Sequence, residues 1–189
     1  TAQAFALAAH VVTLDLVNQR VAPLSLEPRT LLALPDAETG RLTLRMSTQM
    51  PSGVRNSVCD ALGIAKADVR VIEGDVGGGF GSKIYHYGEE ALVLAAAKKI
   101  KKPVKWVAER SESFLSDAHG RDHVTKIELA LDKDNNFTAL RTDTYANMGA
   151  YLSTFAPSVP TWLHGTLMAG NYKSPLIYVN VKAVFTNTV

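Results

Sequence analysis

The sequence lacks the features that mark several large classes of protein. Cys59 is the single cysteine among 189 residues, so the chain alone can build neither a disulfide framework nor a thiolate metal cage. The longest apolar run, residues 91–97, is far shorter than the roughly 20 residues that cross a bilayer. The formal net charge of +2 favours neither nucleic-acid nor membrane-surface binding. We therefore expect a globular protein that binds neither nucleic acid nor membrane, and a buried lone cysteine is compatible with the cytoplasm.

Clusters of catalytic or metal-binding residues are also scarce. His119 and His123 stand four residues apart, but no third ligand lies near them in sequence, and a metal site needs three or four. Asp117, Arg121 and Asp122 are expected to form surface ion pairs. We therefore expect no residue of this chain to bind a metal directly.

The spacing of apolar residues along the sequence predicts the secondary structure. Apolar and polar residues alternate in strands, whereas apolar residues recur every three to four positions in helices. The first strand is expected to begin at Ala4 and to run to Val17, with its β-rich part at residues 10–17. The other strands expected on this basis are residues 41–47, 69–73, 104–107, 126–131, 137–145 and 176–185. The expected helices are residues 51–62, 87–99, 111–116 and 156–170, and residues 23–35 are taken as a connector. This order predicts an α+β fold with a mixed sheet, antiparallel hairpins and packed helices.

Both ends of the chain are extended and apolar, whereas natural domains usually end in polar tails. We therefore expect residues 1–189 to be a single partial domain, a fragment of a longer subunit. Apolar faces around residues 1–17 and 176–189 are expected to drive self-association, which light scattering would detect.

One segment concentrates the chemical signal. Residues 74–83 read Gly-Asp-Val-Gly-Gly-Gly-Phe-Gly-Ser-Lys, so four of the five residues from Gly77 to Gly81 are glycine. Without side chains, a ligand can approach closely and backbone N–H groups can point at an anion or oxo group. Phe80, a bulky residue inside the run, favours a shaped site over a flexible linker.

Two familiar glycine motifs do not fit this loop. A P-loop needs Gly-Lys-Ser/Thr at its end, but Lys83 follows Ser82 and precedes Ile84. A dinucleotide fingerprint needs a third glycine where Ser82 stands, when counted from Gly77. A nucleotide-binding enzyme that uses the loop for phosphate, and a non-catalytic interaction domain, stay open as alternatives.

Four segments, in the same order and spacing, resemble one family, the molybdenum hydroxylases. These enzymes include xanthine dehydrogenases, aldehyde oxidoreductases (aldehyde oxidases) and carbon monoxide dehydrogenase large chains. The similar segments are residues 77–83 (GGGFGxK), 46–49 (S-T-Q), 103–112 (R/K-P-V…R-x-E) and 146–151 (A-N-x-G-A-Y). The resemblance implies the molybdopterin-binding part of a large subunit, in an oxidoreductase that hydroxylates aldehydes or heterocycles or acts on carbon monoxide.

The resemblance also implies roles for individual residues. Gln49 would place its amide, with two donors, near an oxo ligand on molybdenum. Phe80 and Gly81 would lie against the cofactor, Gly81 through its backbone N–H, and core packing is the alternative for Phe80. Gly78 and Gly79 would permit the close approach.

Substrate-cavity roles are implied less specifically. Asn147 and Tyr151 could line a substrate funnel, although a turn beside Gly149 explains Asn147 equally well. Ile84 stands where purine-oxidising members have a glutamate, which argues against xanthine as the substrate.

The remaining machinery is expected outside this chain. The resemblance places the base glutamate and an arginine- or cysteine-bearing loop beyond Val189, so this fragment holds no catalytic residue and is expected to be inactive alone. The implied cofactor is a molybdopterin, with its dinucleotide form left open. The implied partners are the rest of the subunit and the subunits or domains that carry 2Fe–2S clusters and FAD.

Overall fold

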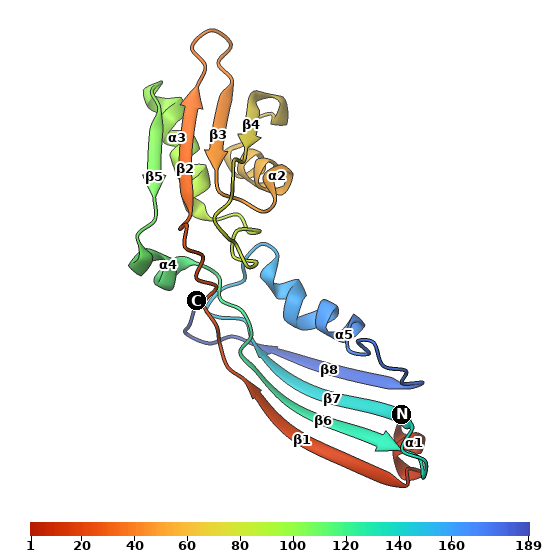
Figure 1. Cartoon of the computed structure of the whole chain (residues 1–189). Helices are drawn as coiled ribbons and strands as arrows, with labels where there is room; N and C mark the ends of the chain where they lie inside the picture. The colour runs from red at the N-terminus through yellow and green to blue at the C-terminus, as the bar shows by residue number, and fades with distance from the viewer. The chain divides into compact units, whose positions relative to one another are not determined.

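The chain forms two compact units. The computed structural model describes residues 1–189 apart from the side chain of Ala156. Unit 1 comprises residues 1–21 and 119–189, and unit 2 comprises residues 22–118, inserted between them. Each unit has its own four-stranded mixed sheet together with helical segments (Figure 1), so the expected α+β class is confirmed. The sequence did not predict this division, and the single partial domain over residues 1–189 stays a prediction.

Unit 2 is a sheet with two helices packed against it. Its strands lie in the order β4-β3-β2-β5, and only β3 and β4 are parallel. The helix α2 makes the crossover between these two parallel strands, as a βαβ unit requires. The elements are β2 (Thr30–Pro35), β3 (Leu42–Met46), α2 (Pro51–Leu62), the turn η1 (Lys66–Asp68), β4 (Val69–Ile72), α3 (Gly88–Ile100), β5 (Val104–Val107) and α4 (Arg110–Ser116).

The limits of α2 follow from its sequence. Pro51 stands at the first turn, where its missing N–H leaves no hydrogen bond unmade. Gly63 ends the helix in the left-handed conformation, with φ of 62°, which favours glycine. Between them, Val54, Val58 and Cys59 are buried against the sheet, which explains the burial of the lone cysteine. The apolar face of α2 therefore fixes the orientation of the crossover.

One hydrophobic cluster holds unit 2 together. Its buried members come from β2, β3, β4, α2 and α3: Leu31, Ala33, Leu42, Leu44, Met46, Val54, Val58, Cys59, Val69, Val93, Leu94 and Ala97. Alternate residues of β2 and β3 point into it, the pattern of a sheet with one face on the core. The end of β3 is thereby fixed, and the residues that follow it begin from a rigid position.

Unit 1 is a long sheet in the order β1-β6-β7-β8. β1 (His10–Asn18), β6 (His123–Leu131) and β7 (Phe137–Asn147) are antiparallel neighbours, and β8 (Ile177–Val184) runs parallel to β7. A helical segment lies beside β8 (Figure 1), made of η2 (Ala156–Ser158), a π-helical turn η3 (Val159–Leu163) and α5 (His164–Thr166). All nine residues of β1 are exposed, and the expected self-association through this region stays a prediction.

Two expectations about local structure are wrong. Residues Ala2–Ala6 form the short helix α1, so the first strand begins at His10 and not at Ala4. The segment taken as a connector contains β2, which pairs with both β3 and β5. Residues 31–34 of this strand are all apolar, so the period of two that marks a half-buried strand is missing from the sequence. No helix in the described part of the chain is long and apolar enough to span a membrane.

The core of unit 2 gives a stability prediction. Leu44 is fully buried, so Leu44→Ala leaves a cavity and is expected to lower the free energy of unfolding by about 2–5 kcal/mol. Leu92 lies on α3 with 70% of its surface exposed, and Leu92→Ala should change that free energy by less than about 0.5 kcal/mol. Urea unfolding of both variants checks this, and equal losses would contradict the assignment of the core.

Two histidines of unit 1 give a pH prediction. The rings of His123 and His164 lie 5.7 Å apart between centroids. Burial lowers the pKa of both, and the neighbouring His164 lowers that of His123 further, below the ordinary 6.5. The unfolded chain therefore binds protons first on acidification, so stability should fall as pH drops through the range just below 6.5.

Denaturant unfolding between about pH 7.5 and about pH 5.5 measures this dependence. His164→Phe should reduce the slope of stability against pH, because one buried ring then no longer titrates. An unchanged slope would show that the histidine pair does not couple folding to pH.

Candidate functional site

The glycine loop lies between β4 and α3, in unit 2. Gly78 and Gly81 both have φ of 95°, a conformation that favours glycine. Between them, Phe80 has φ of 50° and is 75% exposed, so an aromatic side chain stands out from the loop on a left-handed backbone. Strain of this kind persists only where the surroundings fix it, and it clusters at functional sites. Phe80 is thus not part of the hydrophobic core of unit 2, and its contact with a cofactor stays a prediction.

Gln49 lies directly beside this loop. It follows β3, and its Oε1 accepts a hydrogen bond from the backbone N–H of Gly81 at 3.1 Å. A Cβ built on Gly79 would lie 2.6 Å from Cδ of Gln49, so this close approach depends on the absence of a side chain. The bond occupies the amide oxygen, and within the described residues no acceptor is recorded for the Nε2 group. The amide therefore presents its two N–H donors outward from a fixed position.

The backbone donors of the loop differ from those expected. The N–H of Gly81 was expected to face the cofactor, but it is bound to Gln49. Among the residues that the structure describes, no acceptor is recorded for the N–H groups of Gly78, Gly79 and Phe80. These three successive amides, and not that of Gly81, are the donors that the loop can offer to a ligand.

A buried lysine fastens the loop to the rest of the unit. The Lys83 side chain is only 1% exposed. Its Nζ donates to the Glu27 carbonyl oxygen at 2.8 Å, to Glu27 Oε2 at 2.9 Å and to Ser47 Oγ at 2.6 Å. The Lys83 carbonyl oxygen accepts hydrogen bonds from Thr48 Oγ1 and from the Gln49 backbone N–H. The residue that ends the loop thus binds the segment that carries the glutamine.

The same carboxylate of Glu27 reaches the start of the loop. Its Oε2 accepts hydrogen bonds from the Gly77 N–H and from Ser47 Oγ, each at 2.7 Å. Partial burial raises the pKa of Glu27, but the bonds from Ser47, Lys83 and Gly77 outweigh it and hold the pKa below its usual 4.5. Glu27 therefore stays ionised near neutral pH and remains a partner for the Lys83 cation.

A second buried cation supports the far side of the loop. Arg29 is 3% exposed and pairs with Asp117 at 2.7 Å and with Glu89 at 3.1 Å. Its guanidinium carbon lies 3.9 Å from the centroid of the Tyr87 ring, and the Tyr87 hydroxyl donates to the Ser82 carbonyl oxygen. Asp117 is buried, so the surface ion pair expected for it is wrong.

The structure gives little support to the hypothesis that the loop binds the phosphate of a nucleotide. A P-loop lysine must reach the ligand, but the Nζ of Lys83 is buried against Glu27 and Ser47. The beginning of α3 is also occupied, because Glu90 Oε2 accepts a hydrogen bond from the Tyr87 N–H at 2.9 Å. With Glu89 in the same first turn, that helix end carries negative charge of its own.

The expected substrate-cavity residues fall in two places. Ile84 is half-buried immediately after the loop, in unit 2. Asn147 belongs to unit 1, where its side chain binds Asp122 and Thr188 through Nδ2 and the Gly149 N–H and Thr186 hydroxyl through Oδ1. These bonds support the turn interpretation of Asn147. Tyr151 is 66% exposed in the same unit, and the funnel roles of all three stay predictions.

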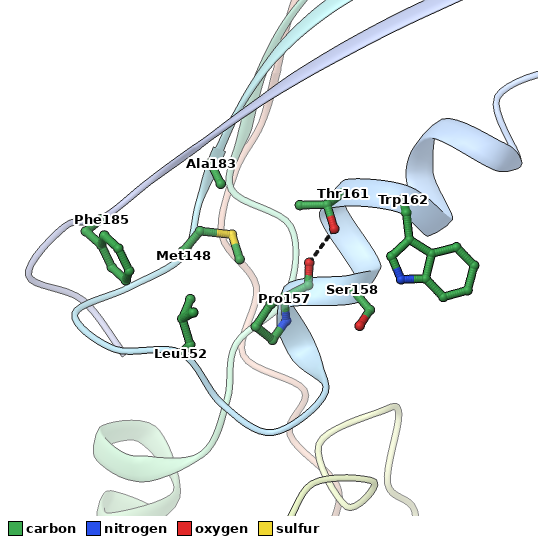
Figure 2. A pocket seen from close by; sticks show the side chains of 8 residues that line it. All are labelled: Met148, Leu152, Pro157, Ser158, Thr161, Trp162, Ala183 and Phe185. Carbon is green, nitrogen blue, oxygen red and sulfur yellow. Dashed lines mark hydrogen bonds between the residues drawn. The ribbon is translucent and has the colours of Figure 1, made fainter.

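Unit 1 holds a cavity of its own, of about 360 Å³ (Figure 2). Met148 and Phe185 line it beside the helical segment that carries Pro157 and Trp162. The other lining residues are Leu152, Ser158, Thr161 and Ala183. The Thr161 hydroxyl donates to the Pro157 carbonyl oxygen at 2.6 Å, so it is satisfied within its own helix. None of the expected site residues lines this mostly apolar cavity.

Sequence reasoning missed the residues that support the loop. Glu27 was not singled out, because it lies 50 residues before Gly77 in a segment taken as a connector. Lys83 was considered only as a P-loop lysine and as the last residue of the GGGFGxK motif, not as a buried ion-pair partner. The charges of Glu27 and Lys83 were the signal in the sequence that could have indicated this contact, because lysine and glutamate are rarely buried unless they are paired.

With this geometry established, comparison with known proteins gives a consistent result. The chain matches the family of molybdopterin cofactor-binding domains over residues 1–189. It is 38% identical over 149 residues to the nicotine 6-hydroxylase large subunit of Paenarthrobacter nicotinovorans, covering 79% of this chain and 18% of that protein. It is 34% identical over 184 residues to the carbon monoxide dehydrogenase large chain of Hydrogenophaga pseudoflava, covering 97% and 23%.

Solved structures agree in fold. Quinoline 2-oxidoreductase from Pseudomonas putida 86 matches with a TM-score of 0.91 at 34% identity, over 99% of this chain and 24% of that one. Reconstituted carbon monoxide dehydrogenase from Oligotropha carboxidovorans matches with a TM-score of 0.88 at 30% identity, over 100% and 24%. The chain therefore spans about a quarter or less of each of these proteins.

The contact between Gly79 and Gln49 gives a prediction with a matched control. Gly79→Ala should push the Gln49 side chain away and break its bond with Gly81, at a cost of about 0.5–1.5 kcal/mol in unfolding free energy. The Gly81 amide should then exchange its hydrogen faster. Gly74→Ala meets nothing within 4 Å and should change neither quantity. Hydrogen exchange and urea unfolding measure both, and equal behaviour of the two variants would contradict the contact.

Proposed function

This chain belongs to the molybdopterin cofactor-binding domain family, and we propose that Gln49 and the glycine loop form its contact surface for the molybdenum cofactor of an oxidoreductase. The observation that carries this proposal is the position of Gln49, whose amide is bound to the loop beside the exposed ring of Phe80. The hydrogen-bond donors and the Phe80 ring lie within unit 2. A side chain at position 79 would collide with Gln49 and disturb this arrangement.

The residues present fit such a group. The two N–H donors of Gln49 suit an oxo or other anionic oxygen, and the amides of residues 78–80 add further donors. The bare glycines allow the group to approach the backbone, and the Phe80 ring can lie against a flat ligand and exclude water. When bound, the molybdenum cofactor supplies the redox chemistry, and the role of this chain is to bind and orient it.

The proposed activity is hydroxylation of an aldehyde or heterocycle, or oxidation of carbon monoxide. The names of the relatives support this range, because they include a nicotine hydroxylase and carbon monoxide dehydrogenases. Ile84 cannot supply the carboxylate that the family resemblance associates with purine oxidation, so xanthine is not proposed as the substrate. Ile84 in unit 2, and Asn147 and Tyr151 in unit 1, are each proposed to contact the substrate in the complete protein.

The complete protein is proposed to need further parts. The family resemblance puts the catalytic base in the remainder of the subunit, so the isolated fragment is proposed to be inactive. Partner subunits or domains carrying 2Fe–2S clusters and FAD would accept the electrons. A relative named as the gamma subunit of a dehydrogenase complex supports multi-subunit assembly. A cytoplasmic location is part of the proposal and is compatible with the buried free thiol of Cys59.

Metal analysis of the full-length protein tests this function. We expect molybdenum and a pterin in stoichiometric amounts, and a preparation that is active without molybdenum would refute the proposal. Gln49→Ala should lower molybdenum retention or turnover by about 10- to 100-fold, the range found when residues that orient a metal site are replaced. Gln19→Ala, at an exposed glutamine outside the loop, is the control and should retain both.

A further inference from the structure

We propose that Glu27 is the positioning residue of the cofactor-contact surface, because its carboxylate joins the glycine loop to the segment that carries Gln49. The expected effect of Glu27 on cofactor binding rests on the proposed function. Its effect on the conformation of the glycine loop does not depend on any ligand. Among the described residues, the Glu27 side chain hydrogen-bonds Gly77, Ser47 and Lys83, so its action passes through these residues.

One oxygen atom carries the connection. Oε2 of Glu27 accepts hydrogen bonds from the Gly77 N–H at 2.7 Å, from Ser47 Oγ at 2.7 Å and from Lys83 Nζ at 2.9 Å. Gly77 begins the glycine run 77–81 and Lys83 ends the loop, so residues on both sides of the run bind the same carboxylate. A carboxylate accepts several hydrogen bonds at once, and bonds to charged groups are stronger than neutral ones.

The connection continues to Gln49 through two routes. Ser47 stands two residues before Gln49, at the end of β3, and its hydroxyl binds both Glu27 and Lys83. The Lys83 carbonyl oxygen accepts the Gln49 backbone N–H at 2.9 Å. A shift of Glu27 therefore moves the loop and the glutamine together, which a bond to only one of them would not do.

Packing shows that this contact is tight as well as polar. A Cβ on Gly77 would lie 2.6 Å from Cβ of Glu27, so the loop backbone rests directly on the Glu27 side chain. The Glu27 N–H also donates to the Gly77 carbonyl oxygen at 3.3 Å. A side chain at position 77 would thus collide with Glu27, whereas a side chain at position 79 would collide with Gln49.

The test uses the full-length protein and the variant Glu27→Gln, which keeps the shape of the side chain and removes its charge. We expect backbone hydrogen exchange in residues 74–83 to become about tenfold faster or more, because an amide oxygen in the place of Oε2 makes only neutral bonds to Gly77 and Ser47 and no ion pair with Lys83. Molybdenum loss during dialysis should accelerate by about 10- to 100-fold. Glu128→Gln, which breaks an ion pair with Arg141 in unit 1, is the matched control and should change neither rate.

A double variant separates positioning from simple charge neutralisation. In Glu27→Gln alone, Lys83 is left as a buried cation without its carboxylate, which itself lowers stability. Glu27→Gln with Lys83→Met removes that cation, so thermal stability should recover, and the double variant remains measurable if the single one fails to fold. Loop exchange and molybdenum loss should stay fast, because the ion pair that joined residues 27 and 83 is absent from the double variant.

The outcomes are distinct. If the double variant recovers wild-type exchange and retention together with stability, Glu27 only neutralises Lys83 and the inference is overturned. Wild-type exchange in Glu27→Gln would overturn it as well. If the wild-type protein contains no molybdenum, the proposed function fails, and the exchange rates still decide whether Glu27 positions the loop.

Discussion

The ion pair between Lys83 and Glu27 is the constraint on which the site geometry depends. A lysine cation that is 1% exposed has lost its hydration, which costs several kcal/mol unless partners replace the water. Lys83 finds three acceptors, and two of them belong to Glu27. Because the pair must stay together, the three segments that contribute to it, around residues 27, 47 and 83, are held in one arrangement.

That arrangement explains how a glycine-rich loop can hold a fixed shape. Glycine loses more conformational freedom on ordering than any other residue, so four glycines in five positions would favour a mobile segment. The loop is instead bound at Gly77 by Glu27, at Gly81 by Gln49 and at Ser82 by Tyr87. These bonds also compensate for the strained backbone of Phe80. A site that is held before its ligand arrives loses less entropy on binding.

Much of the fold could be predicted from local patterns, and the supporting contacts could not. Alternation and helical spacing located β3, α2 and α3, whereas β2 escaped because its residues 31–34 are all apolar although only alternate ones are buried. The approach of Gln49 to the loop was predicted only through resemblance to a family. Glu27 and Lys83 lie 56 residues apart, and no periodicity encodes a contact at that separation.

The central claim is that the Gln49 amide and the Phe80 ring face the metal cofactor. Anomalous X-ray diffraction at the molybdenum absorption edge, on crystals of the full-length protein, tests it most directly. The account predicts an anomalous peak beside these two side chains, with a metal-bound oxygen or sulfur within hydrogen-bonding distance of the Gln49 Nε2. A molybdenum peak elsewhere in the protein, with the glycine loop facing only solvent or other protein, would contradict it.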